Sequence, residues 1–143
     1  ESRDSFIQAC LGLYPVRLSP KVKIMRALCD GKTRLVTVNS SRAAVLSPLH
    51  QTLYNFVSRK EWCLRGEAVP GRFPFEKIAG QVFVSGDYES ATDNLNLGVA
   101  RHILGCILRR CSSVPISIRE SAVDSLQMLL VTPDRREVMQ QRG

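Results

Sequence analysis

The dipeptide Asp30-Gly31 is the feature that most restricts how this 143-residue chain can fold. It lies between two β-prone runs that together extend from Val22 to Val38. Asp-Gly is favoured in two-residue type I′ turns, because both central residues of such a turn need positive φ. The sequence therefore predicts a β-hairpin over 22–38.

Two basic residues of this predicted hairpin fall on the same face. Side chains alternate along a strand, so Lys32 and Arg34 project side by side, about 7 Å apart. They could bind a triphosphate, Arg through bidentate hydrogen bonds and Lys as a compact charge. A solvated strand face explains the same pair, and basic strands also resist aggregation. Lys21, Lys23 and Arg26 give a similar but less directed signal, as candidate RNA or phosphate contacts.

The charge of the chain is concentrated in its first half. The formal net charge is +7; residues 1–72 hold 12 Lys and Arg against 5 Asp and Glu, and residues 73–143 hold 8 of each. An excess of this kind points to an anionic partner, which could be nucleic acid, nucleotide phosphates or a membrane surface. An apolar fraction of 44% argues against disorder, and no apolar run approaches the ~20 residues of a spanning helix. We expect no membrane span.

The five cysteines and two histidines do not form a recognisable metal pattern. There is no Cys-x-x-Cys pair, and Cys106 and Cys111 are five residues apart on a predicted helix. This spacing argues against zinc and favours reduced thiols in a cytosolic setting. Catalysis by a Cys/His pair would need His50 or His102, each inside an amphipathic helix, where packed or solvent-facing roles are commoner.

Three helices are predicted from apolar periodicity and capping residues. One covers 47–60 with Ser47 as its N-cap, one follows a cap at Thr92 or Asp93, and one covers 117–130. A turn and a final polar strand follow the third helix. Together with the hairpin, these elements predict a mixed α/β (α+β) fold.

A short apolar run, 81–85, is long enough for a buried strand and ends at Gly86-Asp87. Asp93 follows six positions after Asp87, at the predicted helix start. The two carboxylates would then share one rim of a sheet, where α/β proteins usually bind ligands. Magnesium typically takes one or two such carboxylates beside substrate phosphates. A helix cap at Asp93, a turn at Asp87 and a covering role for Tyr88 explain the same residues without chemistry.

These two regions resemble motifs of one enzyme family. Residues 85–95 (SGDYESATDNL) closely resemble motif A of viral RNA-dependent RNA polymerases, in the form used by botourmiaviruses (ourmia-like mycoviruses) and their narnavirus and levivirus relatives. Residues 31–38 (GKTRLVTV) resemble motif F, and residues 62–66 (WCLRG) look like the ourmia-like pattern between them. The resemblance runs from about residue 20 to the end, with the motifs in the family's order.

The resemblance implies a role for each matching residue. Asp87 would be the catalytic aspartate that binds two Mg²⁺ ions (Mn²⁺ can serve in their place), with the Tyr88 backbone carbonyl as a further ligand. Asp93 would sense the ribose 2′-hydroxyl and so favour NTP over dNTP. Lys32 and Arg34 would hold the incoming triphosphate. This division suits phosphoryl transfer, in which positioning and charge neutralisation supply most of the catalysis.

The resemblance also implies an internal fragment of a right-hand polymerase. Residues 1–72 would be part of the fingers, and residues 73–143 would be the first palm strand and helices, ending before motif B. The Gly-Asp-Asp of motif C is absent, so we expect no polymerisation by the fragment alone, an exposed strand edge and uncovered apolar surface. The implied partners are the RNA template and product, NTPs and the remainder of the chain. The implied location is the host cytoplasm, or mitochondria as in some related viruses.

Three other classes of protein remain open from the sequence. A non-catalytic basic RNA-binding module would use residues 21–42 for phosphates and leave Asp87 structural. A reverse transcriptase, or another palm-domain polymerase, would prefer a bulky residue in place of Asp93. A protein–protein interaction domain explains the helices but not the presence of both motifs.

Overall fold

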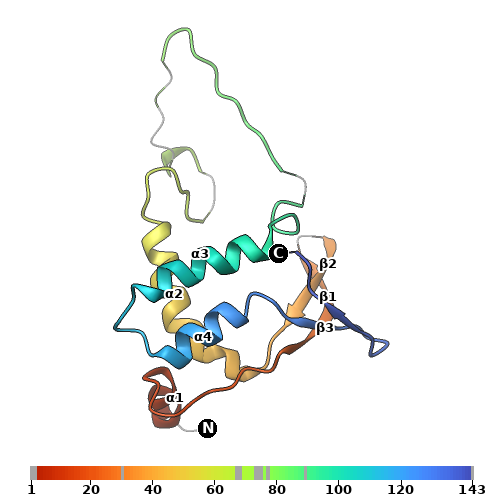
Figure 1. Ribbon diagram of the computed structural model, residues 1–143. Coiled ribbons are helices and arrows are strands. Elements are labelled where there is room, and N and C mark those ends of the chain that lie inside the picture. Colours follow the sequence, from red (N-terminus) through yellow and green to blue (C-terminus); the bar gives the residue numbers. More distant parts are fainter. Residues whose placement is uncertain are drawn as a thin grey trace. The chain divides into compact units, whose positions relative to one another are not determined.

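The computed structural model describes residues 3–29, 31–66, 69–72, 76, 78–88 and 90–142. The chain divides into two compact units: unit 1 is Glu1–Pro48 with Ser90–Gly143, and unit 2 is Leu49–Glu89. The predicted mixed α/β class is confirmed by helices and a four-stranded sheet (Figure 1). The predicted division at residue 72, between a fingers region and a palm region, stays a prediction. It refers to the regions of a polymerase, and the two compact units do not test it.

Unit 1 contains the sheet and most of the helices. Its elements are α1 (Arg3–Cys10), β1 (Lys21–Cys29), β2 (Lys32–Val38), the 3₁₀-helix η1 (Ser41–Leu46), α3 (Leu97–Arg109), α4 (Ile116–Asp124), β3 (Leu129–Val131) and β4 (Glu137–Met139). Helix α2 (Ser47–Val57) begins at the end of this unit and continues into unit 2, which also holds the short 3₁₀-helix η2 (Pro70–Arg72).

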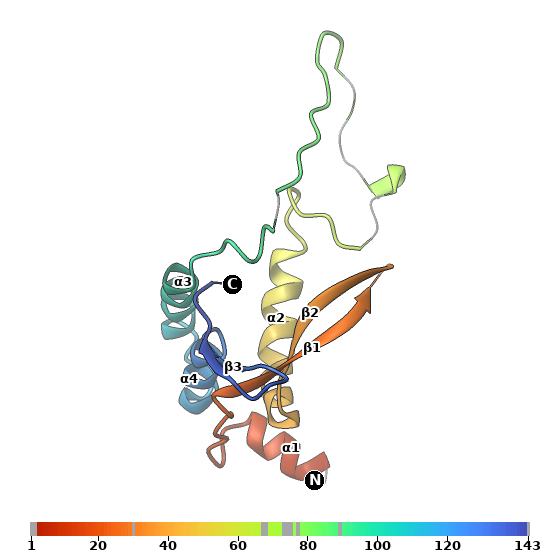
Figure 2. The same ribbon diagram turned by 90° about the vertical axis from the view of Figure 1, so that its right-hand side faces the viewer.

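The predicted hairpin is confirmed and forms half of the sheet. The strand order is β2-β1-β3-β4, in which β1 is antiparallel to β2 and parallel to β3. Cys29 pairs with Lys32, so the turn has two residues. Gly31 in this turn has φ +74°, as a type I′ turn requires; Asp30 lies outside the described residues. Figure 2 shows the far end of the hairpin extending away from α3 and α4.

The core of the molecule lies in unit 1. Helices α3 and α4 lie side by side, and Arg101 of α3 pairs with Asp124 of α4 at 3.4 Å. The buried side chains come from the helices, from β1 and from the segment before β3. They are Ala9, Val22, Val45, Leu97, Leu108, Ile118, Ala122 and Met128. In unit 2, by contrast, none of the described residues is buried.

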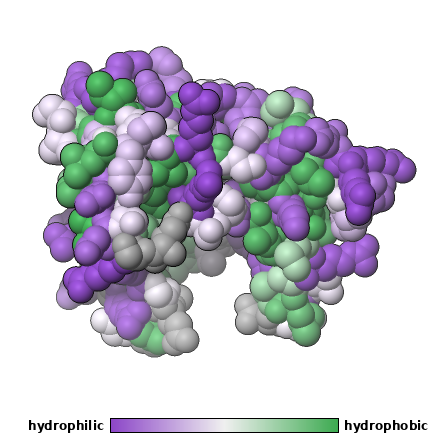
Figure 3. Space-filling view, turned by 90° about the horizontal axis from the view of Figure 1, so that it is seen from below, coloured by the Kyte–Doolittle hydropathy of each residue, from purple (hydrophilic) through white to green (hydrophobic). Residues whose placement is uncertain are grey.

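Many apolar residues remain at the surface. Figure 3 shows hydrophobic residues among hydrophilic ones on the face seen from below. In the hairpin, Leu28 is 77% exposed and Leu35 is 73% exposed. Among the described residues, no helix is both long and apolar enough to cross a membrane.

The predicted cap of α3 is wrong. Asn96, not Thr92 or Asp93, is the N-cap, and its side-chain oxygen accepts a hydrogen bond from the Val99 amide at 3.0 Å. Residues 90–95 form turns of their own, in which the Leu95 amide donates to the Thr92 carbonyl at 3.1 Å. The helix therefore starts only after these turns.

The predicted limits of the other two helices also need correction. Helix α2 starts at Ser47 as predicted, but it ends at Val57 and not at residue 60. Ser47 is not an N-cap, because η1 leads directly into α2 and the backbone of Ser47 already has helical geometry. Helix α4 ends at Asp124, so the prediction of helix to residue 130 is wrong. Residues 129–131 instead pair in parallel with 21–23 of β1, and a helix there would exclude those hydrogen bonds. The predicted final strand is confirmed as β4.

Candidate functional site

The register of β1 and β2 fixes which hairpin side chains lie together. Arg34 pairs with Ala27, and Lys32 pairs with Cys29. Directly opposed residues in an antiparallel pair project from the same face. Because side chains alternate along β1, Lys21 and Lys23 share this face with Lys32 and Arg34. We call these four residues the cationic face.

Arg26 belongs to the other face of the hairpin. It pairs with Leu35, whose side chain points away from the cationic face. On sequence alone Arg26 was treated as one set with Lys21 and Lys23, but the alternation of side chains along β1 places Arg26 on the opposite face. The structure therefore places four of the five basic residues predicted as phosphate contacts on one face of the hairpin, and Arg26 is not among them.

The cationic face is open to solvent, and all four of its residues are exposed. Lys21 forms an ion pair with Glu137 of β4, so part of its charge is already balanced. Lys23, Lys32 and Arg34 form no ion pair with any described carboxylate. Their charges are thus available to an anion, and an exposed arginine and two lysines suit phosphate oxygens.

The predicted buried strand at 81–85 is wrong. Residues 81–88 form no helix or strand, and their apolar side chains are exposed: 85% for Val82 and 90% for Val84. A strand needs a neighbour that receives its hydrogen bonds, and no described residue pairs with this run. β-prone residues alone therefore do not form a strand here.

Asp87 and Tyr88 lie in this exposed segment of unit 2, where Tyr88 is 84% exposed. The Asp87 carboxylate and the Tyr88 carbonyl are oxygen donors, which is the ligand type that magnesium prefers. Within the described ranges, no three His, Cys, Asp or Glu residues gather into a group that could hold a metal. The residues fit magnesium in donor type, and further carboxylates would have to join Asp87 to complete a two-ion site.

Asp93 belongs to unit 1 and is exposed in the turns before α3. The next residue, Asn94, accepts a hydrogen bond from the Arg142 guanidinium at 3.2 Å, and Asn96 forms a β-bridge with Arg142. The turn that carries Asp93 is thus attached to the chain just after β4. Because 81–85 is not a strand, the predicted sheet rim with Asp87 and Asp93 does not form.

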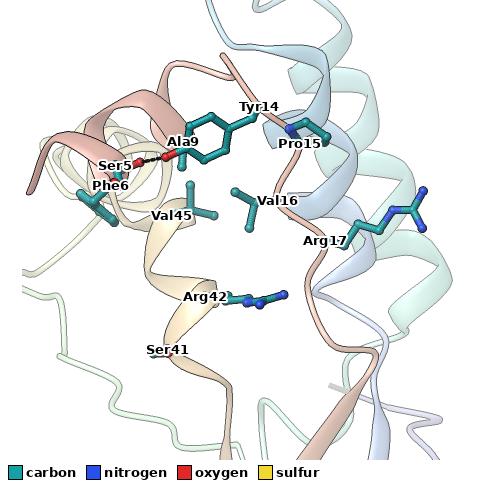
Figure 4. A pocket seen from close by; sticks show the side chains of 10 residues that line it. All are labelled: Ser5, Phe6, Ala9, Tyr14, Pro15, Val16, Arg17, Ser41, Arg42 and Val45. Atoms are coloured by element: carbon teal, nitrogen blue, oxygen red, sulfur yellow. Dashed lines mark hydrogen bonds between the residues drawn. The ribbon is translucent and has the colours of Figure 1, made fainter. Parts of the chain in front are cut away.

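Two features of unit 1 were missed by sequence reasoning. One is Glu137, whose pairing with Lys21 spans 116 residues and depends on the β1–β3–β4 arrangement. The other is a pocket of about 260 Å³ between α1, the segment that follows it and η1 (Figure 4). In this pocket the Tyr14 hydroxyl donates to the Ser5 carbonyl at 2.5 Å, and Val16 faces Val45. No local sequence signal marks either feature.

No protein-family model, no curated protein and no solved structure matches this chain. The resemblance to polymerases therefore rests on the residues of the motifs themselves.

Proposed function

We propose that this chain is part of a viral RNA-dependent RNA polymerase, in which it contributes to template-directed nucleotidyl transfer from NTP to an RNA 3′-hydroxyl. The chain alone would be inactive. The observation that carries this proposal is the cationic face, because Lys32 and Arg34 of the motif-F-like segment lie on it. The motif-A-like segment 85–95 gives independent support from sequence.

In this function the cationic face would contact phosphates. Lys32 and Arg34 would hold the incoming triphosphate and neutralise the pyrophosphate that leaves. Lys23 lies on the same face and extends it along β1, where it could contact the RNA backbone. Lys21 would contribute less charge, because Glu137 already pairs with it.

Asp87 would bind magnesium with the Tyr88 carbonyl, and Asp93 would select ribose. Bound Mg²⁺ would stabilise charge on the attacking and leaving oxygens. The exposed apolar run at 81–85 is consistent with a strand that pairs with other parts of a complete palm. That pairing would place Asp87 beside the other carboxylates of the site.

The decisive test is the D87A variant of a complete polymerase that contains this chain. RNA synthesis from a short template should fall by about a thousandfold or more, because a metal ligand is lost. D134A, which removes an exposed carboxylate in the β3–β4 turn, is the matched control and should retain activity. Unchanged synthesis by the D87A variant would favour the alternative, a non-catalytic RNA-binding module.

A second test separates this proposal from a reverse transcriptase. In the same polymerase, Asp93→Ala should raise the incorporation of dNTP relative to NTP, because the carboxylate that senses the 2′-hydroxyl is gone. A wild-type enzyme that prefers dNTP would instead support the reverse transcriptase.

The role of the cationic face can be tested on the chain itself. The double variant K32A/R34A should bind a short single-stranded RNA roughly tenfold more weakly at low salt, with a smaller salt dependence. R26A is the matched control, because it removes a charge from the same hairpin on the opposite face. Equal losses for single substitutions at Arg26 and Arg34, measured by fluorescence anisotropy, would show that the face is not used.

A further inference from the structure

Cys106 has two nitrogen-bearing neighbours on the same side of α3. The Arg109 guanidinium donates to the Cys106 sulfur at 2.9 Å, and the His102 Nε2 lies 3.5 Å from the same atom. Residues at i−4 and i+3 are neighbours on a helix surface, so the helix itself holds the three side chains together. Cys106 is half-buried, and both its neighbours are exposed.

A surface cavity of about 480 Å³ opens beside this sulfur. It is lined by Cys106, Ile107, Arg109 and Arg110. No carboxylate of the described residues lines it, so an anionic small molecule would meet two guanidinium groups next to the thiol. The arginines also offset the partial negative charge at the C-terminal end of α3, which would otherwise oppose a negatively charged sulfur.

The other cysteines have different surroundings. The Cys10 thiol donates to the Val45 carbonyl at 3.7 Å, and burial raises the pKa of Cys10. The Cys111 thiol donates to the Ile107 carbonyl at 3.4 Å. In both contacts the partner of the sulfur is a backbone oxygen and not a cationic side chain. Among the described residues no sulfur hydrogen bond is seen for the remaining two, Cys29 and Cys63.

We propose that Cys106 is a modification site that forms a mixed disulfide with an anionic low-molecular-weight disulfide. His102 takes the thiol proton, and the Cys106 sulfur attacks one sulfur of the reagent. A new S–S bond forms, the S–S bond of the reagent breaks, and its other half leaves as a thiolate. Cys106 is oxidised and the released thiol is the reduced product. Arg109 stabilises charge on the attacking sulfur, and Arg110 attracts the carboxylates of the reagent.

This proposal is independent of the polymerase function, and the chain itself can test it. The chain is incubated with glutathione disulfide, which is anionic, or with cystamine, which is cationic, and each cysteine is followed by peptide mass spectrometry. Cys106 should react first with glutathione disulfide, and its preference over Cys29 and Cys63 should shrink with cystamine. In urea the five rates should converge, because the preference comes from the folded helix.

Variants test the roles of the neighbours. Arg109→Gln should slow the reaction of Cys106 with glutathione disulfide by up to about fivefold, the size expected for an exposed charge contact. His102→Gln should slow it with both reagents. Arg26→Gln is the matched control for net charge and should leave the rate unchanged. The proposal is overturned if Cys29 or Cys63 reacts first in the folded chain, or if Arg26→Gln slows Cys106 as much as Arg109→Gln does.

Discussion

The two motif-bearing regions of this chain differ in burial and in the number of strands that pair with them. Strand β1 of unit 1 contains Val22, which is 3% exposed, whereas the segment of unit 2 that leads to Asp87 contains Val84, which is 90% exposed. Both segments are β-prone. A motif residue is positioned by this chain only where its backbone has hydrogen-bond partners.

The partners of the hairpin explain this difference. β1 pairs with β3 over Lys21–Lys23 and with β2 over Lys23–Cys29, so each of its residues has a paired neighbour on at least one side. The run 81–85 has no such neighbour among the described residues. The side chains that alternate along this run therefore have no core to pack against, and Asp87 stays on an exposed segment.

The largest expected effect tests the difference in burial. Leu108 of α3 is 2% exposed, and Leu108→Ala should lower the free energy of unfolding by about 3 kcal/mol, through lost apolar contacts and a new cavity. Val84→Ala in unit 2 should change it by less than about 0.5 kcal/mol. Urea denaturation followed by circular dichroism measures both. A comparable loss at Val84 would mean that the segment before Asp87 is packed after all.

A smaller effect tests the backbone conformation of one glycine in each region. Gly31→Ala should destabilise the chain by about 1 kcal/mol, because Gly31 has φ +74° and an L-residue pays to adopt that conformation. A Cβ on Gly31 would meet no atom within 4 Å, so the cost is conformational and not steric. Gly86→Ala, next to Asp87, is the matched control.

Gly86 also has no atom within 4 Å of an added Cβ, and its φ is not positive. Gly86→Ala should therefore leave the unfolding midpoint unchanged. If both substitutions cost the same, the hairpin turn would not depend on the left-handed conformation of Gly31.

The sequence predicted the features that local chemistry determines. The hairpin was predictable because Asp30-Gly31 specifies its own turn, and strand alternation then placed Lys32 and Arg34 together. Features that depend on distant residues were not. Residues 129 and 130 belong to the predicted helix 117–130, but they form part of β3 because they pair with β1, more than 100 residues away in the sequence.

The same limit applies to the candidate site. Lys21 and Lys23 were grouped with Arg26 because the sequence shows only that all three are basic. The register with β2 was needed to place Arg26 on the other face. The strand before Asp87 was predicted from β-propensity, which does not say whether a partner strand is present.

The smallest expected effect concerns the ion pair at the edge of the cationic face. The Lys21 and Glu137 side chains are 52% and 45% exposed, so the pair should contribute about 0.5 kcal/mol to stability. Glu137→Gln should remove that contribution and leave the Lys21 charge unbalanced, which should raise affinity for single-stranded RNA by about twofold at low salt.

Asp134→Asn makes the same change in net charge, but its ion pair is with Arg136 in the β3–β4 turn. If Asp134→Asn raises RNA affinity as much as Glu137→Gln does, the gain reflects net charge alone, and RNA binding does not distinguish the cationic face from the rest of unit 1.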